Sequence, residues 1–297
     1  MLVLVGSQRN SESMLTESTQ FAKLPPANFL FGSTETMRSI RANLELTQAA
    51  DFPLLIEGES GTGKELVARH LHMHFGGIDQ TFVRVSCGAI SPGLFERGMS
   101  GTEGSHTWRL GQHFTSIGLE AGGALFLDEI ADLDLGLQEK LLALFKSGAF
   151  TGGELRVSSE GARIVCASSV GLDEAAECGR ILRDLADCFK SRVRLLPLRE
   201  RKQDIPELCD YLAEEYARKI GRPVPKLNPC VLEAFQKWSW PGNIRELENW
   251  IARIVIFGTE EAVGLGFMRQ IGSVPTTRRH RGIGGRQGRP SRRHQRA

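Results

Sequence analysis

The stretch that decides the fold reads Leu54-Leu55-Ile56-Glu57-Gly58-Glu59-Ser60-Gly61-Thr62-Gly63-Lys64-Glu65. Its first four residues are typical of a buried strand, and the residues that follow it continue as a helix. Between the two lies the spacing Gly-x-x-x-x-Gly-Lys, which in this context is a phosphate-binding loop. The glycines let backbone N–H groups converge on phosphate oxygens, and the helix N-terminus adds partial positive charge. We therefore predict that Lys64 reaches the outer phosphates of a bound nucleotide.

One position departs from the general motif. Glu65 follows Lys64, whereas the usual Ser or Thr would offer a hydroxyl to magnesium. A glycine-rich turn that binds nothing is the alternative interpretation, but the strand–loop–helix order and the lysine argue against it. The residues predicted to hold the nucleotide are Gly58, Glu59, Ser60, Gly61, Thr62, Gly63, Lys64 and Glu65.

A second motif lies farther along the chain. Ala124-Leu125-Phe126-Leu127 is a continuous apolar run that ends in Asp128-Glu129. A carboxylate at such a strand end can hold Mg²⁺, and we assign this role to Asp128. Glu129 can activate a water molecule for attack on the γ-phosphate of ATP. Two acids after an apolar strand are weak evidence alone, but after a phosphate-binding loop they predict an ATP and Mg²⁺ site.

Short apolar strands alternate with amphipathic helices along residues 28–198. Strands are predicted at 53–57, 82–86, 124–128 and 163–167, and helices at 35–47, 64–75 and 137–147. This alternation predicts an α/β fold whose parallel sheet is covered on both faces. Beyond a break near 197–201, a smaller helical part is expected over residues 199–270, with helices at 204–220, 228–238 and 244–257.

The two ends differ in composition from the rest. Residues 1–27 are polar and are interpreted as a lead-in, whereas 271–297 form a basic tail that we expect to be disordered. Eight of the 37 Lys and Arg residues, and none of the 35 Asp and Glu residues, lie within 276–297. Such a tail can touch nucleic acid non-specifically, although a solvated end is the simpler interpretation. No apolar run approaches the roughly 20 residues of a membrane span, so we expect a cytoplasmic protein with no membrane contact.

The chain from about residue 31 to 257 resembles the central AAA+ domain of sigma-54-dependent transcriptional activators. The phosphate loop looks like that family's own, Glu65 included, and residues 122–130 are similar to its second ATP motif. Residues 240–249 look like the family's lid motif, in which Arg245 would contact the nucleotide phosphates. The resemblance implies an AAA+ P-loop NTPase core followed by a small all-helical lid subdomain. It also implies ATP hydrolysis in an oligomeric ring, used to remodel the sigma-54 RNA polymerase holoenzyme.

Several positions depart from the family pattern. Members carry a Gly-Ala-Phe-Thr-Gly-Ala loop that touches sigma-54, whereas the corresponding residues 104–109 read Gly-Ser-His-Thr-Trp-Arg, with His106 in place of the aromatic residue. A look-alike segment at 148–153 lies elsewhere in the order of motifs and is interpreted as coincidence. Ser86 replaces the Asn that restrains the catalytic Glu in the family, and Ser169 replaces the usual Asn of the nucleotide sensor.

The segment that supplies the arginine finger is also altered. The Arg that a neighbouring subunit would insert aligns best with Cys188, and Arg183 or Arg192 could substitute if the loop slides. Such a finger is worth roughly 10³-fold or more in rate. Two main hypotheses follow, beside the further alternatives of another AAA+ remodelling role or a decaying gene product. The chain is either an ATPase that activates sigma-54 polymerase in a homo- or hetero-oligomeric ring, or a degenerate subunit that binds ATP and joins a ring without efficient hydrolysis or sigma-54 contact.

Overall fold

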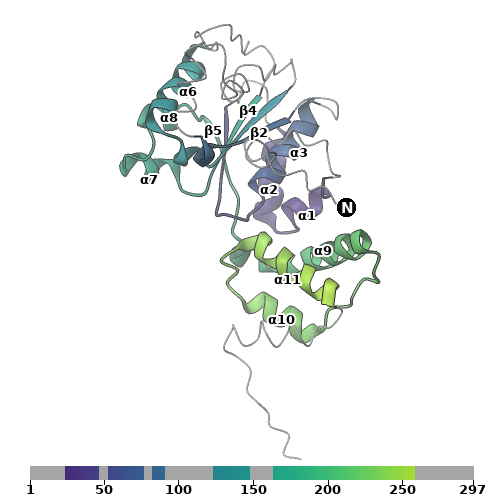
Figure 1. The fold of residues 1–297 in the computed structure, drawn as a ribbon. Helices are drawn as coiled ribbons and strands as arrows, with labels where there is room; N and C mark the ends of the chain where they lie inside the picture. The colour runs from purple at the N-terminus through teal and green to yellow at the C-terminus, as the bar shows by residue number, and fades with distance from the viewer. Residues whose placement is uncertain (1–23, 47–52, 77–81, 91–122, 148–162, 258–297) are drawn as a thin grey trace, which may run out of the picture.

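A parallel sheet forms the centre of the structure, which is a computed structural model that describes residues 24–46, 53–76, 82–90, 123–147 and 163–257 (Figure 1). The sheet has five strands in the order β2-β3-β4-β1-β5, and every neighbouring pair is parallel. The strands are β1 (Leu54–Glu57), β2 (Phe82–Ser86), β3 (Ala124–Asp128), β4 (Arg163–Ser168) and β5 (Ser191–Arg194). The predicted α/β fold is therefore confirmed, and the strand that leads into the phosphate loop lies between β4 and β5.

Helices cover both faces of this sheet, because alternate residues of a strand point to opposite sides. Leu54 and Ile56 pack in one core with α1 (Ala27–Phe31), α2 (Glu35–Glu45) and α3 (Lys64–Gly76). Leu55, between them, packs in a second core with α6 (Leu135–Ser147), α7 (Leu172–Glu177) and α8 (Arg183–Asp187). Figure 1 shows these two sets of helices on opposite sides of the strands. All three residues are fully buried, as a strand enclosed on both faces requires.

A separate helical part follows the sheet, as the sequence predicted. It consists of α9 (Ile205–Ile220), α10 (Pro229–Lys237) and α11 (Asn243–Phe257), which share one apolar core. Trp240 lies at its centre with no exposed surface, and its indole N–H donates to the carbonyl of Phe235 at 2.7 Å. Phe29 of α1 and Leu66 of α3 also contact this core, so the helical part is packed against the start of the α/β part.

Two short signals set the ends of the lid helices. Asn228 precedes α10, and its side chain accepts a hydrogen bond from the backbone N–H of Cys230 at 2.9 Å, which caps the helix N-terminus. Gly221 ends α9 in the left-handed conformation, with φ of 66°, where glycine avoids the steric cost of a side chain. These caps agree with the boundaries expected at 204–220 and 228–238 to within one residue.

Some elements were not predicted. The sequence does not predict the edge strand β5, because its side chains are half-buried or exposed and therefore lack an apolar pattern. Nor does it predict the short helices α1, α7 and α8, which have at most six residues each.

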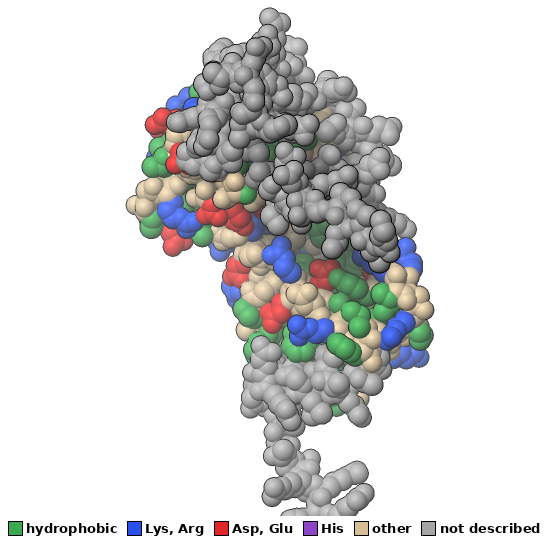
Figure 2. Space-filling view, viewed as in Figure 1, with side chains coloured by type: hydrophobic (Ala, Val, Ile, Leu, Met, Phe, Trp, Pro, Cys, Tyr) green, Lys and Arg blue, Asp and Glu red, His purple; other side chains and the backbone are tan. Residues whose placement is uncertain are grey.

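In the part of the chain that the structure describes, no helix is long and apolar enough to cross a membrane. On the face shown in Figure 2, acidic, basic and hydrophobic side chains are interspersed over the coloured surface. The basic tail lies outside the described residues.

Candidate functional site

The phosphate loop lies between β1 and α3, at the carboxyl ends of the strands. Gly61 has φ of 79° and Gly63 has φ of 99°, a conformation that other residues adopt only at a cost. A side chain at Gly61 would also place its Cβ 2.3 Å from the carbonyl oxygen of Gly242 in the lid. Glycine at position 61 is thus required both by the turn of the loop and by the close approach of the lid.

Lys64 is turned into the loop and is only 7% exposed. Its ammonium donates to the carbonyl oxygens of Gly58 at 2.7 Å and Glu59 at 3.3 Å, and to the hydroxyl of Ser169 at 2.9 Å. It also lies 3.3 Å from a carboxylate oxygen of Glu129. A buried ammonium needs such partners, and a phosphate oxygen is a stronger partner than a neutral carbonyl. The lysine is therefore placed where an anion entering the loop would meet it.

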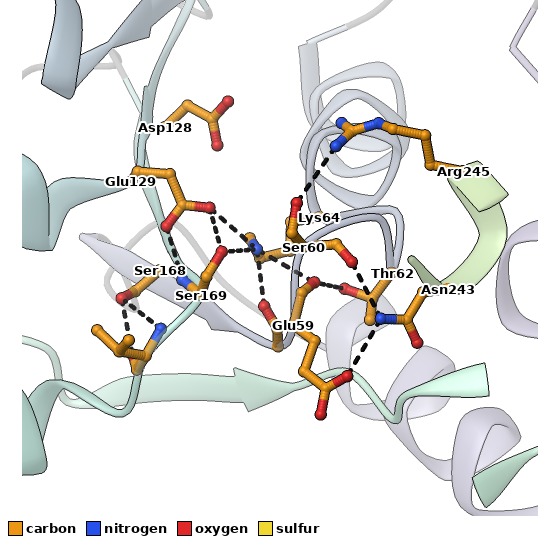
Figure 3. A network of polar contacts seen from close by, with 12 residues as sticks. Glu59, Ser60, Thr62, Lys64, Asp128, Glu129, Ser168, Ser169, Asn243 and Arg245 are labelled. Carbon is orange, nitrogen blue, oxygen red and sulfur yellow. Dashed lines mark hydrogen bonds and ion pairs between the residues drawn. The ribbon is translucent and has the colours of Figure 1, made fainter. Parts of the chain in front are cut away.

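Glu129 faces this lysine from the end of β3. Its backbone is left-handed, with φ of 57°, a conformation that costs a non-glycine residue about 1–2 kcal/mol and is common at functional sites. One carboxylate oxygen accepts the backbone N–H of Ser169 at 2.7 Å, and the other accepts the Ser169 hydroxyl. Figure 3 shows Glu129, Ser169 and Lys64 joined in one polar cluster. Ser169 therefore bridges the two charged residues that were predicted to act on a nucleotide.

Asp128 is held by a residue that the sequence analysis did not assign. Arg84 of β2 donates to a carboxylate oxygen of Asp128 at 2.7 Å, and its Nε lies 3.3 Å from Glu65 at the start of α3. Glu65 is also paired with Arg69 at 2.8 Å. The carboxylate of Asp128 supplies the oxygen atoms that Mg²⁺ prefers, and Mg²⁺ beside a nucleotide needs only one or two protein carboxylates. Asp128 therefore fits the predicted metal.

Glu59 of the phosphate loop binds two residues of the lid. The guanidinium of Arg199 donates to both carboxylate oxygens of Glu59, at 2.8 and 2.6 Å. The Asn243 amide donates to one of these oxygens at 3.2 Å. The hydrogen bonds from Arg199, and then from Asn243, lower the pKa of Glu59 to about 2. Glu59 therefore remains an anion that fixes the lid residues against the loop.

Backbone contacts complete this junction. Asn243 is fully buried and donates to the Ser60 carbonyl at 3.0 Å, while the N–H of Ile244 donates to the Gly61 carbonyl at 3.0 Å. Arg245, which was predicted to contact the phosphates, donates to the Ser60 hydroxyl at 3.2 Å (Figure 3). The structure thus brings Arg245 to the loop, as the predicted role requires.

Two buried charged residues join the lid to the start of the α/β part. Arg201 is 1% exposed and donates to the carbonyl oxygens of Leu30 and Thr62, each at 3.3 Å. Burial lowers the pKa of Arg201. Asp204, fully buried, accepts the backbone N–H groups of Ser33 at 2.9 Å and Thr34 at 3.2 Å. The lid is therefore anchored to α1, α2 and the loop at once.

The residues considered for an arginine finger lie apart from this cluster. Arg192 donates to Ala186 and Phe189 carbonyls at 2.7 and 3.1 Å and to Asp173 at 3.0 Å. Arg183 is exposed and lies 3.5 Å from Asp187. Cys188 donates its thiol to the Asp184 carbonyl at 3.2 Å. All these partners belong to the α7–β5 region. Residues 104–109, which hold His106, and the look-alike segment 148–153 lie outside the described residues.

Three side chains of the site were not predicted from the sequence: Arg84, Arg199 and Asn243. Asn243 lies in the segment 240–249 that resembles the family's lid motif, and Arg199 lies in the break near 197–201 that separates the two parts, so position alone could have marked them. The sequence gives only a weak indication that Arg84 belongs to the site. Arg84 is two residues before Ser86 in the strand, and the alternation of side chains along a strand puts both on one face. In the described part of the chain, no group of three or more His, Cys, Asp and Glu residues is arranged to hold a metal by itself.

Comparison with known proteins assigns the family. The sigma-54 interaction domain matches residues 30–193, which is more than half of the chain, and the AAA+ ATPase lid domain matches residues 199–270. This chain belongs to the sigma-54 interaction domain family. The first match covers β1 to β4, all but the last residue of β5, and the phosphate loop, and the lid match covers α9, α10, α11 and the lid residues that contact the loop.

Curated members of the sigma-54 interaction family are similar over most of this chain. The response regulator protein PilR of Pseudomonas aeruginosa is 37% identical over 233 residues, which are 77% of this chain and 52% of PilR. The transcriptional regulatory protein ZraR of Klebsiella oxytoca is 35% identical over 259 residues, 86% of this chain and 57% of ZraR. The chain thus spans about half the length of these relatives.

Solved structures support the same AAA+ fold. NtrX from Brucella abortus in complex with ADP has a TM-score of 0.66 and 29% identity, over 79% of this chain and 52% of NtrX. The RuvB branch migration motor of Thermotoga maritima, at 16% identity and a TM-score of 0.53, covers 82% of this chain and 73% of RuvB. The likeness to RuvB concerns the fold alone.

Proposed function

We propose that this chain binds and hydrolyses ATP in an oligomeric ring and uses the energy to remodel the sigma-54 RNA polymerase holoenzyme. The observation that carries the proposal is the cluster of Lys64, Ser169 and Glu129 at the phosphate loop, where a cation and a candidate base lie 3.3 Å apart. ATP is the nucleotide best supported, because NtrX from Brucella abortus, 29% identical, was crystallised with ADP and with ATP.

Each side chain of the site has a proposed task. Residues 58–65 wrap the phosphates with backbone N–H groups, and Lys64 leaves its carbonyl partners for the outer phosphate oxygens. Arg245 approaches the same phosphates from the lid. Asp128 holds Mg²⁺, which when bound neutralises charge on the phosphate oxygens. Glu129 accepts the proton of the attacking water.

A second candidate function has one observation in its favour. The position expected for the arginine finger is Cys188, and Arg192, one possible substitute, is committed to Asp173 and to two carbonyls of its own subunit. Arg183 is the better substitute, because it is exposed and, among the residues that the structure describes, pairs only with Asp187 at i,i+4. If neither acts, the chain is a degenerate subunit that binds ATP in a mixed ring but hydrolyses it slowly.

Calorimetry and turnover test the proposal together. We expect heat from ATP and Mg²⁺ with the folded wild type, and none with Lys64→Ala. An active ring predicts phosphate release per subunit that rises with protein concentration, since a finger acts between subunits. No heat with the wild type would contradict both functions. Heat without turnover would favour the degenerate subunit, which sedimentation with an intact activator would then detect as a mixed complex. Co-sedimentation with sigma-54 holoenzyme in the presence of ATP tests the partner.

A further inference from the structure

Arg84 connects two carboxylates on opposite sides of the candidate metal site. It extends from β2 toward the end of β3, where the register places Asp128 opposite Ser86. Its guanidinium bonds Asp128 at 2.7 Å while its Nε lies 3.3 Å from Glu65 of α3. The bridge therefore spans β3 and α3, the two elements between which the phosphates of a nucleotide would lie.

The position of Arg84 matters because of its charge. Arg84, Asp128 and Glu65 are 32%, 19% and 35% exposed, so their interaction is only partly screened by water. An arginine does not lose its proton in proteins. The positive charge of Arg84 therefore lies beside Asp128 at every working pH. A divalent ion that approaches Asp128 without a nucleotide is repelled by this charge.

Glu65 adds a second reason for the bridge. Its carboxylate is in the first turn of α3, at the helix end that would receive phosphates. A carboxylate there would repel a triphosphate, but Arg84 and Arg69 both lie within ion-pair distance of it. The two arginines therefore neutralise the acid that stands in the place of the usual hydroxyl.

We propose that Arg84 is the resident cation of the metal site, which keeps Asp128 from binding a divalent metal until a nucleotide arrives. The negative charge of nucleotide phosphates beside the loop would draw Arg84 off Asp128 while it keeps its contact with Glu65, and Asp128 would then be available to hold the metal. The proposal rests on the proposed binding of ATP and Mg²⁺. The proposal predicts that the metal binds tightly only when a nucleotide is also bound, and weakly to the nucleotide-free chain.

Metal binding to the nucleotide-free chain tests this directly. Mn²⁺ serves as the probe, and electron paramagnetic resonance measures how much of it stays free. We expect Arg84→Met to bind Mn²⁺ at least about tenfold more tightly than the wild type, because the competing charge is gone. Arg180→Met is the matched control: it removes an arginine from an exposed pair with Asp132, 2.9 Å long, that does not contact Asp128. The control should bind Mn²⁺ as weakly as the wild type.

The possible outcomes separate this proposal from the proposed function. Equal Mn²⁺ affinity in Arg84→Met and wild type, with ATP still giving heat, would overturn the proposed role of Arg84 and leave the proposed ATP binding in place. Absence of ATP heat in the wild type would overturn ATP binding itself. If circular dichroism shows that Arg84→Met is unfolded, Arg84→Gln replaces it. Glutamine also removes the positive charge beside Asp128 but keeps a polar end, so a similar gain in Mn²⁺ affinity is expected, and no gain would refute the proposal.

Discussion

The contact between the phosphate loop and the lid predicts a large effect of Gly61→Ala. The new Cβ would lie 2.3 Å from the Gly242 carbonyl oxygen and 3.2 Å from the Cβ of Arg245. The first neighbour is backbone, which cannot rotate away as a side chain can. The lid must therefore move off the loop, and the hydrogen bond from Ile244 N–H to the Gly61 carbonyl, now 3.0 Å, is lost.

The size of the effect follows from two terms. Alanine at φ of 79° costs about 1–2 kcal/mol, and one lost backbone hydrogen bond costs about 1 kcal/mol. The sum is about 2–3 kcal/mol in the free energy of unfolding. For a folded unit of this size, each kcal/mol shifts Tm by about 2–4 °C. We therefore expect Tm to fall by about 4–12 °C, and ATP affinity to fall with it because the loop is distorted.

Thermal unfolding followed by circular dichroism measures this shift. Gly88→Ala is the matched control, because Gly88 has no positive φ and its added Cβ would make only ordinary contacts at 3.6 and 3.8 Å with Asp132. Its Tm should remain within about 2 °C of the wild type. If Gly61→Ala unfolds at the same temperature as Gly88→Ala and binds ATP equally well, the lid does not pack on the loop as argued.

Three further predictions concern the site. Because the pKa of Glu59 is lowered from 4.5 to about 2, its contribution to stability is complete above pH 4.5 and is lost as pH falls toward 2. Urea unfolding of Glu59→Gln should therefore show a shallower decline over that range than the wild type, and parallel curves would contradict the pairing. Ser169→Ala should slow ATP turnover at least about tenfold while ATP still gives heat, because Glu129 loses its hydroxyl partner; unchanged turnover would remove Ser169 from the mechanism. Cys188→Arg should raise turnover by roughly 10-fold or more if the finger is missing, with Cys178→Arg as an exposed control, and no gain would place the finger elsewhere.

The elements that the sequence predicted well share one property: their signal is local. Strand β3 is a run of four buried apolar residues followed by Asp128 and Glu129, so the pattern and the acids lie side by side in the chain. The phosphate loop is likewise contiguous. In contrast, β5 reads Ser-Arg-Val-Arg and is half-buried, so only its pairing with β1 identifies it as a strand.

The contacts that the sequence did not predict join distant segments. Arg199 and Glu59 are 140 positions apart, and Arg84 and Asp128 are 44 apart. Their pairing depends on the strand order, which puts β2 beside β3, and on the packing of the lid, which a local pattern does not encode. Charge alone does not select these partners, because the chain holds 37 Lys and Arg residues and 35 Asp and Glu residues.

The same few loop residues face both the catalytic side and the lid. The carbonyls of Gly58 and Glu59 accept the Lys64 ammonium, while the side chain of Glu59 and the next two carbonyls bind Arg199, Asn243 and the backbone of α11. A phosphate that draws Lys64 out of the loop removes donors from those first carbonyls. Because the loop backbone is continuous, we predict that its adjustment shifts the carbonyls that hold the lid. Nucleotide occupancy and lid position are therefore expected to be coupled through Glu59 itself, without a longer path through the protein.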